Sequence, residues 1–144
     1  MAQTFISNHH HIVFSTKQRA QLIKNKEKLC AYVAGICRNI GIVPRAIGGM
    51  DDHCHLLLTH RDEQVSKMVN AIKSNSSKWM NEHKHGFAWQ NGYAAFSVSA
   101  SNIASVTRYI ENQEEHHRKR TFEEEYIALL KKHDVEFDEK YVFD

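Results

Sequence analysis

The 144-residue chain contains a single proline, only six glycines and no apolar run of the roughly 20 residues that a membrane-spanning helix requires. It shows no linker, repeat or low-complexity segment, so we expect one domain over residues 1–144. The first residues lack a basic segment followed by an apolar core, which argues against a signal peptide. No association with a membrane is therefore expected.

Cysteine is also scarce, since the chain has three, at positions 30, 37 and 54. An odd and low count gives no disulfide framework, and a reducing cytoplasm is the natural setting for it. Cys30 and Cys37 lie seven apart in a predicted helix, where they are expected to pack as small apolar residues.

The net charge of +2 hides an asymmetry between the two ends of the chain. Residues 17–45 hold seven basic side chains against one acidic side chain, whereas residues 111–144 hold eleven acidic and six basic ones. A basic first half is compatible with nucleic acid binding. On charge alone, a solvated helix face explains it better.

Hydrophobic periodicity predicts an α+β fold with an antiparallel sheet and helices packed on one face. The predicted strands are 5–16, 42–50, 52–60 and 96–100, and the predicted helices are 20–41, 62–83, 101–117 and 121–132. A tight turn at residues 50–52 joins the second and third strands. Asp62 and Ser101 are expected to be N-caps, and Thr121 with Glu124 fits a capping box.

The segment GGMDDHCHLLLTH, residues 48–60, places two histidines in a predicted strand. Because side chains alternate along a strand, His53 and His55 share a face, while Cys54 points with the leucines toward the helices. The two imidazoles would lie on the opposite, open face, spaced to share one divalent ion. Eleven histidines give roughly one His-x-His by chance, however, so a core strand that carries imidazoles is the alternative.

Tyr109 and Gln113 form a second constellation, four residues apart on the third predicted helix. An apolar stripe of Ile103, Val106 and Ile110 should bury this helix against the sheet. A phenol and a carboxamide would then be held at the edge of the packed helix. The alternative is a half-buried core tyrosine and a solvated glutamine.

Together these groups predict metal-assisted chemistry on a phosphodiester. Two imidazoles and an amide oxygen form an incomplete shell that suits Mn²⁺ or Mg²⁺, with positions left for water or a phosphate oxygen. The metal would stabilise charge developing on the phosphate, and a tyrosine hydroxyl could attack phosphorus. A covalent phosphotyrosine retains the energy of the broken bond, so the strand can be rejoined without ATP.

The order of several motifs resembles that of single-tyrosine HUH transposases, the small transposases of single-strand insertion sequences and their relatives associated with repetitive palindromes. The similarity extends from about Asn8 to Tyr141 and rests on HHIVFSTKQR, GGMDDHCHLLL, IKSNSSKW, FAWQNGYAAFSVS and YIENQEEHH. Two departures stand near these motifs, namely Thr59-His60, where the family often has a proline, and Ala94, where it often has glycine.

The resemblance implies a ferredoxin-like or RRM-like HUH fold and a role for each residue. His53 and His55 would bind the metal, Gln113 would be the third ligand, and Tyr109 would be the nucleophile. It also implies a homodimer and single-stranded DNA with hairpin ends, cleaved to leave a 5′-phosphotyrosine and a 3′-hydroxyl.

Basic, polar and aromatic side chains suggest the path of the strand, since lysines and hydroxyls suit phosphate contacts and aromatic rings stack on bases. The candidates are Lys17, Arg19, Arg45, Asn70, Lys73, Ser77, Lys78, Trp89 and Tyr93. A solvated polar face explains any one of them as well, and Trp89 fits a core position better. His116 and His117 could position DNA, although solvent exposure is the simpler expectation.

Two other functions stay open at this point. One is a non-catalytic single-stranded nucleic-acid-binding module, a domesticated relic of a transposase. The other is a metal-dependent phosphodiesterase that uses water and forms no covalent adduct. The sequence also leaves open the metal, the DNA ends recognised, and whether Tyr109 acts within its own subunit or across a dimer.

Overall fold

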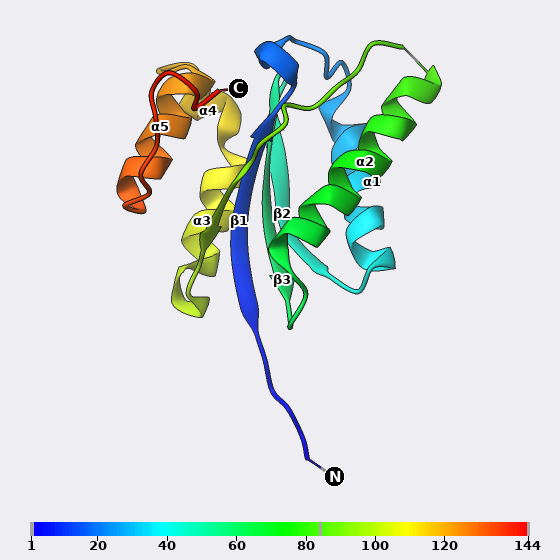
Figure 1. The fold of residues 1–144 in the computed structure, drawn as a ribbon, viewed down its shortest axis with the longest axis vertical. Coiled ribbons are helices and arrows are strands. Elements are labelled where there is room, and N and C mark those ends of the chain that lie inside the picture. Colours follow the sequence, from blue (N-terminus) through cyan, green and yellow to red (C-terminus); the bar gives the residue numbers. More distant parts are fainter. Residues whose placement is uncertain (1, 84, 144) are drawn as a thin grey trace.

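The computed structural model of the chain describes residues 2–83 and 85–143. Within them, one antiparallel sheet has the strand order β2-β3-β1-β4 (Figure 1). Its strands are β1 (Asn8–Ser15), β2 (Val43–Met50), β3 (His53–His60) and β4 (Ala94–Ser97). The predicted α+β class is confirmed, and the turn predicted between β2 and β3 lies at Asp51 and Asp52.

The helices are α1 (Lys26–Asn39), α2 (Val65–His83), α3 (Ile103–Glu111), α4 (Gln113–His117) and α5 (Phe122–Lys132). Three of them, α1, α2 and α3, begin later than predicted, and α3 follows Asn102 without a side-chain cap, so the predicted N-cap at Ser101 is wrong. The side chain of Asn25 caps α1 by accepting from the backbone N–H of Lys28 at 3.0 Å, and α2 begins three residues after Asp62. Among the described residues, no helix is both long and apolar enough to cross a bilayer.

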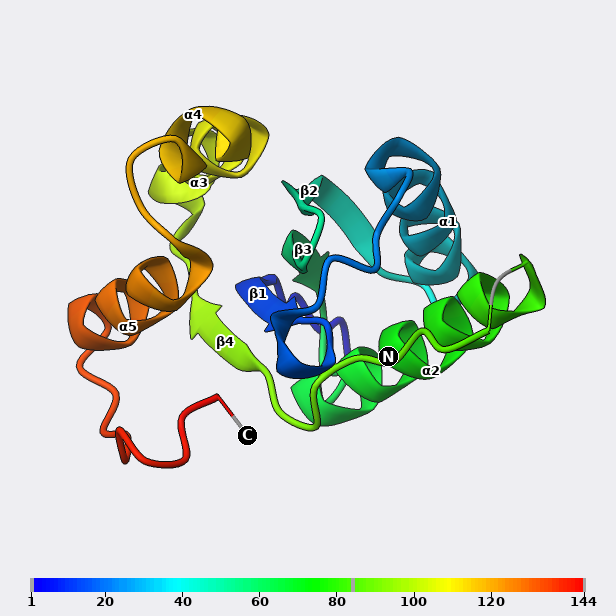
Figure 2. The ribbon, with the colours of Figure 1, turned by 90° about the horizontal axis from the view of Figure 1, so that it is seen from above.

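The α1/α2 face of the sheet carries the larger core. Cys54, Leu56 and Leu58 of β3 pack there with Ile12 and Phe14 of β1, as the alternation along β3 predicts. Figure 2 shows α1 and α2 on this side of the sheet.

The opposite face is covered as well, so the expectation that helices pack on one face is incomplete. Figure 2 shows α3, α4 and α5 on that side. Leu57 packs there against Ile110 of α3, and Val13 packs in a cluster with Tyr126 of α5. The apolar runs in β1 and β3 are continuous rather than alternating, which is the pattern of strands buried on both faces.

The two glycines at the end of β2 allow close backbone approaches. A Cβ on Gly48 would lie 2.5 Å from the carbonyl oxygen of Ile110, so this glycine lets α3 rest directly on β2. Gly49 has a φ of 152°, and a Cβ there would lie 2.1 Å from the carbonyl oxygen of His53. The Gly-Gly pair therefore positions both the hairpin and α3.

Candidate functional site

The His53 and His55 rings project from β3 to the same face, and both are fully buried. The prediction that this face is open is wrong, because α3, α4 and α5 lie over it. The rings nevertheless have polar neighbours, contributed by Gln113 of α4 and Glu125 of α5. The pair is therefore buried in a polar centre.

Each imidazole has one nitrogen anchored outside the centre and one directed into it. The Nδ1 of His53 lies 2.7 Å from the Asp52 carboxylate, and its Nε2 lies 3.0 Å from Gln113 Oε1. The Nδ1 of His55 lies 2.9 Å from His11 Nε2, and its Nε2 lies 3.0 Å from Glu125 Oε1. A histidine anchored through one nitrogen presents the other in a set orientation, as metal-ligating histidines do.

Tyr109 reaches this centre from α3. Its hydroxyl donates a short hydrogen bond to Glu125 Oε2, and its ring stacks on His116 with centroids 4.5 Å apart. Burial, together with the negative charge of Glu125, holds the pKa of Tyr109 well above its usual range. The phenol is therefore protonated in this arrangement.

Gln113 does not share a continuous helix with Tyr109, so the predicted single helix over 101–117 is wrong. The chain breaks at Asn112 (φ −102°, ψ 29°), which separates α3 from α4. The apolar stripe of α3 ends at Ile110, so packing no longer favours a continuous helix beyond it. After the break, Gln113 is 2% exposed, and its amide nitrogen donates to Glu125 Oε2 at 3.2 Å.

Glu125 occupies the middle of the centre, although it is not among the site residues predicted from the sequence. Its side chain is fully buried, with Oε1 3.0 Å from His55 Nε2 and 3.1 Å from His117 Nε2. Burial alone would raise the pKa of Glu125, but its hydrogen bonds with His117, His55 and Tyr109 hold that pKa far below the usual range. The carboxylate is therefore ionised.

A signal for Glu125 was present in the sequence. On α5 the buried residues are Phe122, Glu125, Tyr126, Leu129 and Leu130, so the glutamate lies within the apolar stripe. A charged residue at a buried position is seldom found unless it has partners. An acidic residue in the stripe of a capped helix thus indicates a polar partner across the interface.

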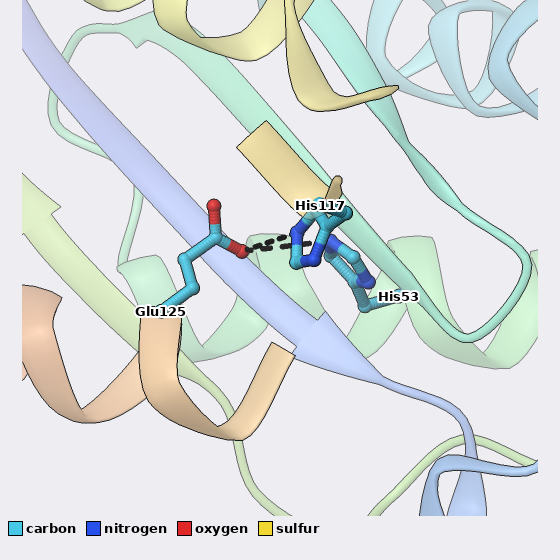
Figure 3. Close-up of side chains that lie close together, drawn as sticks. All are labelled: His53, His117 and Glu125. Atoms are coloured by element: carbon cyan, nitrogen blue, oxygen red, sulfur yellow. Dashed lines mark hydrogen bonds and ion pairs between the residues drawn. The ribbon is translucent and has the colours of Figure 1, made fainter. Parts of the chain in front are cut away.

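His117 was expected to face solvent, but it lies in the centre. Its Nε2 is 3.1 Å from Gln113 Oε1 and 3.1 Å from Glu125 Oε1. The hydrogen bond with Glu125 raises the pKa of His117. Figure 3 shows His53, His117 and Glu125 converging from β3, α4 and α5, and their ligand atoms all lie within 4.8 Å of one another. These three residues are a group that could hold a divalent cation.

The residues predicted to contact DNA fall into two groups. Lys17, Arg45, Asn70 and Lys78 are exposed, and Ser77 and Tyr93 are half-buried. The other three, Arg19, Lys73 and Trp89, are at least partly buried and have partners within the chain. The exposed Arg45 also donates to Thr59 Oγ1 at 3.0 Å.

Arg19 donates to the carbonyl of Phe143 at 3.0 Å, and Lys73 donates to the carbonyl of Gln90 at 2.6 Å. Trp89 is buried between Phe14 and Phe87, so little of its ring surface is left for a base.

Comparison with known proteins identifies one family. The family model described as transposase IS200 like matches residues 4–113. The crystal structure of a candidate transposase from Deinococcus radiodurans R1 is similar with a TM-score of 0.61 and 26% identity, covering 78% of this chain and 96% of that one.

A REP-associated tyrosine transposase bound to a REP hairpin is similar with a TM-score of 0.62 and 13% identity, covering 81% of this chain and 72% of that one. At this identity the likeness is one of fold. Among curated proteins, none matches this chain.

Proposed function

Because the chain belongs to the IS200-like transposase family, whose members process DNA, we propose that it cleaves and rejoins single-stranded DNA through a covalent 5′-phosphotyrosine. In this proposal residues 1–144 act as one HUH endonuclease domain, Tyr109 is the nucleophile, and the substrate is DNA with hairpin ends. The observation that carries the proposal is the link from the Tyr109 hydroxyl, through Glu125, to the Nε2 atom of His55.

The residues of the centre fit a divalent cation. In the neutral His53 tautomer whose Nδ1–H donates a hydrogen bond to Asp52, Nε2 carries a lone pair directed at Gln113 Oε1, which is itself an acceptor. Two acceptors 3.0 Å apart are stabilised by a cation between them. We propose that His53, His55 and Gln113 hold Mg²⁺ or Mn²⁺, which would supply charge stabilisation to the phosphate and to the attacking oxygen.

The chain's own residues set up the attack. Glu125 Oε2 fixes the phenol of Tyr109 by accepting its hydrogen bond, and it is the carboxylate within reach that can take up the proton. The phenol oxygen then bonds to phosphorus as the bond from phosphorus to the 3′ oxygen breaks. The departing oxygen takes a proton and leaves as a 3′-hydroxyl. In the reverse direction, a 3′-hydroxyl attacks the phosphotyrosine and rejoins the strand.

We propose that exposed polar residues bind the DNA strand. Lys17, Asn70 and Lys78 are exposed and can contact phosphates, as can the outer nitrogens of Arg45, whose Nε donates to Thr59 Oγ1 at 3.0 Å. Tyr93 offers part of a ring for stacking. The REP-associated transposase of similar fold is bound to a hairpin, which supports hairpin DNA as the ligand here. A homodimer, as the resemblance implies, stays part of the proposal.

One assay tests the function. Labelled single-stranded hairpin DNA is incubated with the protein and Mn²⁺, and a denaturing gel is examined for a protein–DNA band. We expect a band for the wild type and for Tyr141→Phe, because Tyr141 is 57% exposed and lies outside the centre. No band should form with Tyr109→Phe or in excess EDTA.

The other outcomes identify the alternatives. Cleavage without a band would contradict the tyrosine mechanism in favour of a water-using phosphodiesterase. Binding without cleavage would favour a non-catalytic module. A band that persists in Tyr109→Phe would assign the nucleophile to another residue.

A further inference from the structure

We propose that Glu125 and His117 are ligands of the divalent cation, so that a carboxylate and a further imidazole join His53, His55 and Gln113 in its shell. The inference rests on the metal centre of the proposed function and adds two residues to it. Both lie beyond residue 113, where the match to the family model ends.

The distances between donor atoms carry the inference. Four donor atoms form a closed ring, in which His53 Nε2 is 3.0 Å from Gln113 Oε1, which is 3.1 Å from His117 Nε2. His117 Nε2 is 3.1 Å from Glu125 Oε1, which is 3.6 Å from His53 Nε2. An octahedral shell with bonds of about 2.1 Å places neighbouring ligands about 3 Å apart. The ring therefore has the size of one coordination shell.

The hydrogen-bonding capacity of the four atoms also supports a cation among them. His117 Nε2 bears at most one hydrogen, yet it faces two acceptor oxygens, those of Gln113 and Glu125. His53 Nε2, with its partner nitrogen bonded to Asp52, faces the same two oxygens. When both Nε2 atoms are unprotonated, all four atoms direct a lone pair at the same point, and one cation can accept a lone pair from each.

Charge compensation favours an anion at this place before the phosphate of the DNA binds. A divalent cation bound only by His53, His55 and Gln113 would be a buried charge with neutral ligands, and such a charge needs compensation. The Glu125 carboxylate is fully buried and 3.6 Å from His53 Nε2, so it supplies a negative charge inside the shell. Asp52 supplies a second one behind the His53 ring.

The position of Glu125 is built into α5. The Thr121 capping box fixes the first turn of the helix, and Phe122 packs on the His53 ring with centroids 4.5 Å apart. With Oε1 on the imidazoles, Oε2 remains on the Tyr109 hydroxyl. The Glu125 carboxylate thus contacts the proposed nucleophile through one oxygen and the proposed cation through the other. In this arrangement α5 contributes a ligand to the centre as well as covering it.

Mn²⁺ binding to the intact chain tests the inference without reference to activity. Free Mn²⁺ is followed by electron paramagnetic resonance as protein is titrated in, for the wild type, Glu125→Gln and His117→Gln. Glu123→Gln and His85→Gln are the matched controls, because both positions are exposed. Losing one coordination partner should weaken binding by at least about tenfold, whereas the controls should keep wild-type affinity.

A His53→Gln variant separates this inference from the proposed function. If His53→Gln binds Mn²⁺ as tightly as the wild type, the metal centre itself is absent and the proposed function loses its cation. If His53→Gln weakens binding while Glu125→Gln does not, the centre stands and the added ligand is refuted.

Circular dichroism identifies variants that keep the native fold. If Glu125→Gln does not fold, Mn²⁺ binding is measured with the conservative variant Glu125→Asp and with His117→Gln instead. Wild-type affinity in a natively folded variant overturns the assignment of that residue.

Discussion

Replacing Gly48 with alanine should move the helix that carries Tyr109. An added Cβ would lie 2.5 Å from the Ile110 carbonyl oxygen and 3.1 Å from its Cγ2 atom. Ordinary contacts of this kind begin near 3.4 Å, so α3 must retreat from β2 by about 1 Å. Gly48 has a backbone conformation open to alanine, so the contact alone causes the effect.

The expected size follows from the displacement. Overpacking of this kind costs about 1–3 kcal/mol of stability, which urea unfolding measures as a lower midpoint. Tyr109 precedes Ile110, so its hydroxyl moves with the helix. A misplacement of about 1 Å can lower the rate of a positioned reaction by about 100-fold, which the rate of adduct formation would show.

Gly35→Ala is the matched control. A Cβ at Gly35 in α1 meets nothing within 4 Å, and alanine is the better helix former by about 1 kcal/mol. The same substitution should therefore stabilise the protein at position 35 and destabilise it at position 48. If Gly48→Ala unfolds at the wild-type urea concentration, α3 does not rest on this glycine as described, and the reasoning fails.

Two further predictions concern stability. Thr121→Ala removes the side chain that accepts from the Glu124 backbone N–H, so it should lower the free energy of unfolding by about 1 kcal/mol; an unchanged urea midpoint would contradict the role of the cap. Burial, and then the charge of His60, lowers the pKa of His10 below 6.5, so the folded state binds fewer protons than the unfolded state. Stability should fall as pH drops through 6.5, and His10→Gln should reduce that slope in urea titrations at several pH values; an identical slope would refute the assignment.

Much of the fold was accessible from local patterns. Alternation along β3 placed Cys54, Leu56 and Leu58 in the core, and the Thr121–Glu124 capping box marked the start of α5. The periodicity of Ile103, Val106 and Ile110 predicted the face by which α3 packs on the sheet. These features depend on neighbours within one or two turns, so a single sequence contains them.

The sequence also separated the two histidines from Cys54 by face and singled out Tyr109 and Gln113 by spacing. It could not show that the chain breaks at Asn112, because polar residues follow Ile110 and carry no periodic signal. The sequence also did not predict that helices cover the second face of the sheet, since periodicity tells whether a face is buried but not which helix lies on it.

Local sequence therefore determined the strands, the caps and the residue types able to bind a cation or attack a phosphate. Tertiary structure alone decided that β3, α4 and α5 converge, which brings Glu125 within 3.0 Å of His55 across 70 positions of the chain. The physical reason is that packing of whole helices on the sheet sets such distances. No short-range pattern encodes the path by which α5 returns to cover the histidines.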